Sequence, residues 1–202
     1  MKKNILFVLT MLLTSFSSIN AQNEELPKIP GDKTALLIID VQEFYFPGGQ
    51  VPLNNPEKTS LEIKKVLNAF RNKSMEVIHI RHNASKNANI HNNVSPTEGE
   101  KVITKNEANS FNGTDLHSYL QDRGISHLVI TGMQTHMCVE ATTRAAYDKG
   151  YKCLVPEETS TTRDLKYKEH IIKAEDVHYS TLSTLNYGYA TVLELETLLN
   201  AL

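Results

Sequence analysis

The chain has 202 residues, of which 40% are hydrophobic and 22% charged, and its formal net charge is -2. This length is typical of one ordinary domain, and the near-neutral charge, with Lys and Arg spread along the sequence, argues against nucleic acid as a partner. Cys138 and Cys153 are too few for a disulfide scaffold, and we expect no disulfide between them.

A signal-peptide pattern occupies residues 1–21. Two lysines follow Met1, an apolar run covers residues 5–13, and the small residue Ala21 precedes the expected cleavage point. The apolar run is well short of the ~20 residues that a membrane span needs, although an uncleaved anchor is the alternative. The pattern predicts export to the periplasm or the medium, a mature domain over residues 22–202, and no stable membrane insertion after processing.

Strand and helix patterns alternate along the mature chain. A continuous hydrophobic run that ends on a carboxylate predicts a buried parallel strand over residues 34–40. A helix over 56–72 and a strand over 75–81 follow. Residues 82–100 are rich in Asn and contain Pro and Gly, which predicts a long irregular loop of the kind that is functional or mobile. A short strand over 101–105 comes next.

The second half of the chain continues the alternation. Its predicted elements are a helix over 114–122, a strand over 126–132, a helix over 139–149, a strand at 154–155, a helix over 177–186, a strand over 189–193 and a C-terminal helix. This order predicts an α/β fold with a parallel sheet and helices on both faces. Ligands of such sheets bind beyond the carboxyl ends of the strands, so side chains at those ends are candidate site residues.

Cys138 follows the strand over 126–132, in a turn where Thr135 is a natural N-cap for the next helix. The positive end of a helix lowers the pKa of a cysteine, and the thiolate is the nucleophilic form, so a reactive thiolate is expected here. The N–H groups of the same turn are suited to stabilising an oxyanion. From the residues alone, a catalytic cysteine and a buried structural cysteine both remain open.

Asp40 and Lys105 also follow predicted strands and are expected at the same edge of the sheet. Asp40 is suited to accept a thiol proton, because burial raises the pKa of a carboxyl group while a nearby cation lowers it. Lys105 is a candidate for that cation. The alternatives are that Asp40 caps a helix and that Lys105 is a solvated surface lysine.

These segments together resemble the isochorismatase-like cysteine hydrolases. The resemblance is carried by residues 35–44, by Lys105 and by residues 132–150, and it extends over about residues 33–202. The order and spacing of Asp, Lys and Cys are specific as a set, whereas Asp-Val-Gln alone would be a weak signal. The resemblance implies a three-layer α-β-α, Rossmann-like fold with a six-stranded, mainly parallel sheet, and it implies a homo-oligomer.

The same resemblance implies a catalytic triad of Asp40, Lys105 and Cys138. In that triad Asp40 accepts the thiol proton, and the Cys138 thiolate attacks a carboxamide or related carbon to form a thioester. A cis peptide between Met133 and Gln134 is also implied, with the backbone N–H groups of Gln134 and Cys138 as the oxyanion hole. The expected partner is therefore a small-molecule substrate with a C–N bond, of amide, ureido or lactam type.

The chain also departs from some members of that family. The nicotinamidases carry an Asp-x-His metal motif beside a Trp-His-Pro segment, which this chain, with no Trp, lacks. We therefore expect no metal and no cofactor. True isochorismatases cleave a vinyl ether without a thiol, so Cys138 favours amide chemistry. Vinyl ether hydrolysis and a catalytically inert secreted binding protein remain the alternatives.

Four side chains near the predicted strand ends are candidates for substrate contact: Phe44, His82, Phe111 and His136. The two phenylalanines suit either a pocket wall or the core, and His82 suits either a pocket or a structural position. His178 is expected to pack or cap a helix. His91 lies in the Asn-rich loop, where it is a candidate to close over the site or to reach a neighbouring subunit.

Overall fold

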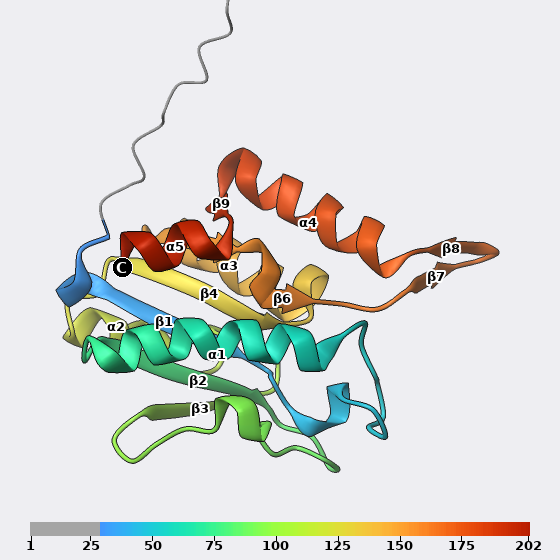
Figure 1. Cartoon of the computed structure of the whole chain (residues 1–202), viewed down its shortest axis with the longest axis horizontal. Coiled ribbons are helices and arrows are strands. Elements are labelled where there is room, and N and C mark those ends of the chain that lie inside the picture. Colours follow the sequence, from blue (N-terminus) through green and yellow to red (C-terminus); the bar gives the residue numbers. More distant parts are fainter. Residues whose placement is uncertain (1–28) are drawn as a thin grey trace, which may run out of the picture.

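The structure is a computed structural model that describes residues 29–202. The expected signal peptide, residues 1–21, lies outside the described residues. Figure 1 shows a central sheet with helices on either side of it. The three-layer α/β fold expected from the sequence is confirmed.

Seven strands form the main sheet, in the order β3-β2-β1-β4-β5-β9 with β6 paired to β4. All pairings among these strands are parallel. The strands are β1 (Thr34–Ile39), β2 (Glu76–His82), β3 (Lys101–Lys105), β4 (His127–Met133), β5 (Lys152–Pro156), β6 (Ser160–Thr161) and β9 (Thr191–Leu193). The expected six-stranded sheet therefore gains one short strand, β6, beside the end of β4.

Five α-helices cover the sheet: α1 (Pro56–Asn72), α2 (Leu116–Asp122), α3 (Glu140–Asp148), α4 (Ala174–Gly188) and α5 (Leu195–Ala201). Alternate residues of β1 point to opposite faces. Leu36 and Ile38 pack in a cluster with α1 and α5, whereas Leu37 and Ile39 pack in a second cluster with α2, α3 and α4. Because both faces are covered, β1 is apolar along its whole length.

Short helical turns occupy several connections: η1 (Gly31–Lys33), η2 (Glu43–Tyr45), η3 (Asn92–Val94), η4 (Thr135–Val139) and η5 (Glu157–Thr159). The turn η4 is π-helical and leads directly into α3. It contains Cys138, so the thiol lies at the carboxyl end of β4, where the sequence places it.

A small antiparallel hairpin, β7 (Leu165–Tyr167) with β8 (His170–Ile172), was not expected from the sequence. The structure also starts α4 three residues before the expected residue 177, because Asp164 Oδ1 accepts a hydrogen bond of 2.8 Å from the Ala174 N–H. Cys138 and Cys153 are free thiols, as expected. Across residues 29–202, no helix combines the length and apolarity needed to cross a membrane.

Candidate active site

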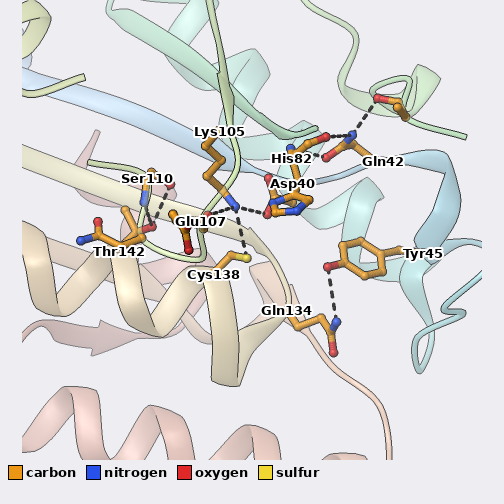
Figure 2. A network of polar contacts seen from close by, with 12 residues as sticks. Asp40, Gln42, Tyr45, His82, Lys105, Glu107, Ser110, Gln134, Cys138 and Thr142 are labelled. Carbon is orange, nitrogen blue, oxygen red and sulfur yellow. Dashed lines mark hydrogen bonds and ion pairs between the residues drawn. The ribbon is translucent and has the colours of Figure 1, made fainter. Parts of the chain in front are cut away.

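Asp40, Lys105 and Cys138 meet at the carboxyl edge of the sheet (Figure 2). Lys105 Nζ donates a hydrogen bond of 2.7 Å to Asp40 Oδ2 and lies 3.3 Å from Cys138 Sγ. Its third contact is the Glu107 carbonyl oxygen, at 3.0 Å. An ammonium group has three protons to donate, so each of them has a partner. The three side chains are 0%, 1% and 6% exposed, which removes them almost entirely from solvent.

The backbone at Asp40 turns sharply where β1 ends. Its φ of 51° lies in the left-handed region, which Asp adopts more readily than most residues. The Asp40 N–H still donates to the Ile80 carbonyl oxygen of β2, at 2.9 Å. The carboxylate is thereby held between β1 and β2, with Oδ2 on Lys105 and Oδ1 buried without a hydrogen-bond partner among the described residues.

Burial is the largest influence on the pKa values of Asp40 and Cys138. It raises the pKa of Asp40, and the charge and hydrogen bond of Lys105 offset part of that rise. The pKa of Cys138 is raised to about 12, first by burial and then by the Asp40 charge, with Lys105 acting in the opposite direction. The low thiol pKa expected from the helix start is therefore wrong for the resting site, because burial and a neighbouring carboxylate raise the pKa of Cys138.

The backbone of the nucleophile turn approaches β1 closely. Gly132 has a φ of 128°, and a Cβ at this position would overlap the Ile39 carbonyl oxygen, so only glycine fits here. The peptide between Met133 and Gln134 is cis, as the sequence resemblance implied. The assignment of the Gln134 and Cys138 N–H groups to an oxyanion hole stays a prediction.

Gln134 faces the loop that follows β1. Its Nε2 donates to the Tyr45 hydroxyl at 3.3 Å, as Figure 2 shows, and its Oε1 is buried without a hydrogen-bond partner among the described residues. Burial raises the pKa of Tyr45, so the phenol is protonated at neutral pH. The pair provides polar groups beside the thiol in addition to the triad.

Gln42 is a structural link that the sequence did not reveal. Its Oε1 accepts the His82 N–H at 2.7 Å, and its Nε2 donates to the carbonyl oxygens of His82 and Ala88 at 3.0 and 2.7 Å. These bonds fix the end of β2 against the loop after β1. The His82 ring lies beside Asp40 in Figure 2, and its charge acts to lower the pKa of that carboxyl.

Phe44 and His82, two of the expected substrate contacts, line one cavity of about 560 Å³. The other residues of its wall are Gln50, Val51, Asn83, Ala84, Ser85 and Lys86. Small polar side chains and one lysine thus surround a partly apolar wall. The composition suits a small polar molecule.

The structure does not bring Phe111 to this cavity. Its ring packs in the core, stacked on Tyr151 with centroids 5.9 Å apart and edge-on to His117 at 6.3 Å. His91 is also engaged elsewhere, because it stacks on Phe46 at 3.7 Å and its Nε2 lies 3.9 Å from Glu57. Neither side chain lines the cavity that contains Phe44 and His82, and Phe111 shares its core cluster with Cys138.

Two residues of the nucleophile turn are tied to the C-terminal part of the chain. His136 Nδ1 lies 2.7 Å from Thr162 Oγ1, and Thr135 Oγ1 lies 2.9 Å from His178 Nδ1. Burial lowers the pKa of His136, and the charge of Arg163 lowers it further. Arg163 therefore adds a cation near this turn, which the sequence did not single out.

Within residues 29–202, no three His, Cys, Asp or Glu side chains gather as a metal site. The polar groups of the site are instead one thiol, one carboxylate, one ammonium group and their neutral partners. A buried thiol beside a carboxylate of raised pKa is an arrangement for nucleophilic attack with proton transfer.

Comparison with known proteins gives consistent relatives. The family model of the isochorismatase domain matches residues 34–187 of this chain. The uncharacterized isochorismatase family protein YddQ of Bacillus subtilis is 42% identical over 177 residues, which cover 82% of this chain and 98% of that protein. The crystal structure of an isochorismatase from Pseudomonas putida KT2440 superposes with a TM-score of 0.80 at 31% identity, over 85% of this chain and 92% of that one.

A relative of named activity matches more distantly. Streptothricin hydrolase of Streptomyces noursei is 27% identical over 140 residues, which cover 65% of this chain and 55% of that protein.

Proposed function

The chain belongs to the isochorismatase family of hydrolases, and we propose that it cleaves a C–N bond in a small amide, ureido or lactam-type molecule. The observation that carries this proposal is the position of Lys105 Nζ, which contacts both the Asp40 carboxylate and the Cys138 thiol in a buried site. The hydrolase activity named for the streptothricin relative supports the same class of reaction.

The reaction starts with proton transfer from Cys138 to Asp40. A thiol of raised pKa keeps its proton in the resting enzyme, so deprotonation accompanies the approach of substrate. The sulfur then bonds to the carbonyl carbon, and the carbonyl oxygen takes up the negative charge. We assign the N–H groups of Gln134 and Cys138 to that oxygen.

Collapse of this intermediate breaks the C–N bond. Asp40 returns its proton to the leaving nitrogen and a Cys138 thioester remains, while ammonia or an amine departs from an open-chain substrate and the amine of a lactam stays attached to the acyl group. Water then attacks the thioester and gives a proton to Asp40, the C–S bond breaks with release of an acid, and Asp40 passes that proton to the sulfur to restore the thiol. Lys105 keeps Asp40 in place and balances its charge during both steps.

Substrate enters, in this proposal, through the cavity lined by Phe44 and His82. His82 connects this cavity with the triad, because it lies beside Asp40. His136 is assigned to substrate contact from its place in the nucleophile turn.

The proposal is tested by measuring whether the Cys138→Ala variant hydrolyses any compound in a panel of amides. The variant is expected to lose detectable ammonia release and to form no covalent adduct at position 138 in intact-mass measurements. Cys153→Ala, which removes the other buried thiol, is the matched control and should keep full activity. Amide hydrolysis that survives Cys138→Ala would contradict the mechanism. Turnover of isochorismate alone, independent of the thiol, would favour vinyl ether hydrolysis, and an inactive wild type would favour a binding protein.

A further inference from the structure

The helix α4 reaches back to the nucleophile turn. His178, in the second turn of α4, places its Nδ1 2.9 Å from the hydroxyl oxygen of Thr135. Thr135 is the first residue of η4 and is fully buried, and Cys138 lies three residues further along the same turn. The hydroxyl–imidazole contact therefore joins α4 to the segment that carries the thiol.

The imidazole of His178 is held from a second side. The backbone of Glu157, in η5, forms a hydrogen bond with the ring. Burial lowers the pKa of His178, and the bond to Glu157 offsets that effect only in part, so the ring is neutral at pH 7. A neutral imidazole has one donor and one acceptor nitrogen, so it can bridge η5 and η4 with a defined orientation.

A nucleophile turn of this kind needs external support. It is a single π-helical turn between β4 and α3, and the thiol at its centre has to remain against Lys105, at the 3.3 Å seen here. A misplacement of about 1 Å in a reacting group costs on the order of 100-fold in rate. Contacts that fix the start of η4 therefore affect the reaction rate, although they do not touch the substrate.

We infer that Thr135 and His178 are a pair of positioning residues that hold the nucleophile turn so that Cys138 stays in register with Lys105 and Asp40. The inference rests on the proposed function, because it assigns the pair a task in that reaction. His178, which the sequence suggested as a packing or capping residue, thereby belongs to the support of the site.

Kinetics of matched variants test the pair in the full chain. Thr135→Val and His178→Leu each remove one partner while conserving much of its volume. Each is expected to lower kcat by about 10-fold to 100-fold with KM within about twofold of wild type. The double variant is expected to be no slower than the slower single variant, because both changes break the same contact. Thr135→Ser, which keeps the hydroxyl, should restore most of the rate.

The control is His117→Leu. His117 makes a similar contact, with Nδ1 3.0 Å from the Tyr151 hydroxyl, and neither residue belongs to η4, to α4 or to the triad. The His117→Leu variant should have a changed thermal midpoint of unfolding and the kcat of the wild type. If folded Thr135→Val and His178→Leu enzymes keep the wild-type kcat, or if their effects on kcat multiply in the double variant, the inference is overturned.

Alkylation of Cys138 by iodoacetamide separates this inference from the proposed function, because it needs no natural substrate. Displacing the thiol from Asp40 and Lys105 changes its pKa, so the pH midpoint of alkylation should shift by about half a unit or more in Thr135→Val and His178→Leu. Thr135→Ala and His178→Ala, which break the same contact with less steric strain, cover the case in which the first pair fails to fold, whereas Thr135→Ser, which keeps the hydroxyl, should keep the wild-type midpoint. An unshifted midpoint in the folded variants overturns the inference even if no amide substrate is found.

Discussion

The thiol of Cys138 has to lose its proton before sulfur can attack a carbonyl carbon. Burial and the Asp40 charge hold its pKa at about 12, so few thiolates exist at pH 7. Asp40, whose own pKa is raised by burial, is the adjacent acceptor for that proton. In the proposed mechanism, deprotonation therefore accompanies substrate binding, because a raised pKa keeps the resting thiol protonated.

Replacement of Asp40 by Asn should slow amide turnover and at the same time make the Cys138 thiol easier to deprotonate. Amide turnover should fall by about 100-fold to 10,000-fold, because the general base is lost. The alkylation midpoint of Cys138 should move to lower pH, because the carboxylate that raises the thiol pKa is gone while the Lys105 cation stays. Initial rates of iodoacetamide modification against pH measure the second effect.

Asp115→Asn is the control for this experiment, because Asp115 pairs with Lys101 at the start of β3, the opposite end of that strand from Lys105. Its alkylation midpoint should equal that of the wild type. A midpoint in Asp40→Asn that is unchanged or higher than wild type would contradict the electrostatic description of the triad.

The proximity of the three side chains of the proposed triad was predictable from sequence for a physical reason. Asp40, Lys105 and Cys138 each follow a strand of one parallel sheet, and the carboxyl ends of such strands share an edge. The contact of Thr135 with His178 was not predictable in this way. It joins residues 43 positions apart, and it depends on how α4 docks on η4, which local periodicity does not report.

At the scale of elements, the six strands β1 to β5 and β9 were expected from sequence, whereas three very short strands were missed. The strand β1 is buried along its whole length, so its sequence is continuously hydrophobic. The strands β6, β7 and β8 have two or three residues each and show no periodicity to detect. The start of α4 was placed too late because the side chain that accepts the Ala174 N–H, that of Asp164, comes from ten residues upstream.

One carboxylate connects three elements at the edge of the sheet. Glu100 accepts hydrogen bonds from Arg71 of α1 at 2.7 and 2.8 Å and from the Thr97 N–H at 2.8 Å, and it lies 2.9 Å from Nε2 of His79 in β2. Burial acts to raise the pKa of Glu100, but these partners outweigh it and bring the value to about 2. The edge of the sheet is thus fastened by an ionised side chain.

This carboxylate should make stability depend on acid pH. A depressed pKa means that the stabilisation is complete above the ordinary value of 4.5 and is lost as pH falls toward about 2. Glu100→Gln should lower the urea midpoint near neutral pH, and its difference from wild type should shrink as pH falls through this window. Glu98→Gln, an exposed neighbour, should follow the wild-type curve at every pH. A difference that stays constant with pH would contradict the assignment.

At the scale of the whole molecule, the β7–β8 hairpin lies outside the hydrophobic core. The β7–β8 hairpin projects from the body in Figure 1, and Tyr167 and Ile171 on it are 66% and 63% exposed. An isolated two-stranded hairpin is marginally stable in water. Exposed apolar side chains on such an arm are typical of a contact surface between proteins.

We propose that this hairpin packs against a second copy of the chain, in line with the homo-oligomer expected from the sequence resemblance.

Sedimentation velocity of the wild type should show a dimer or larger assembly. The double variant Tyr167→Lys, Ile171→Lys should shift this assembly toward monomer, because two charges would be buried without partners. Tyr187→Lys is the matched control, since Tyr187 is 94% exposed at the other end of α4 and should leave the assembly unchanged. A monomeric wild type, or an assembly that survives the double change, would contradict the proposal. Loss of the assembly with kcat intact would show that activity needs no residue of a second copy, in agreement with the contacts of Asp40, Lys105 and Cys138 within one chain.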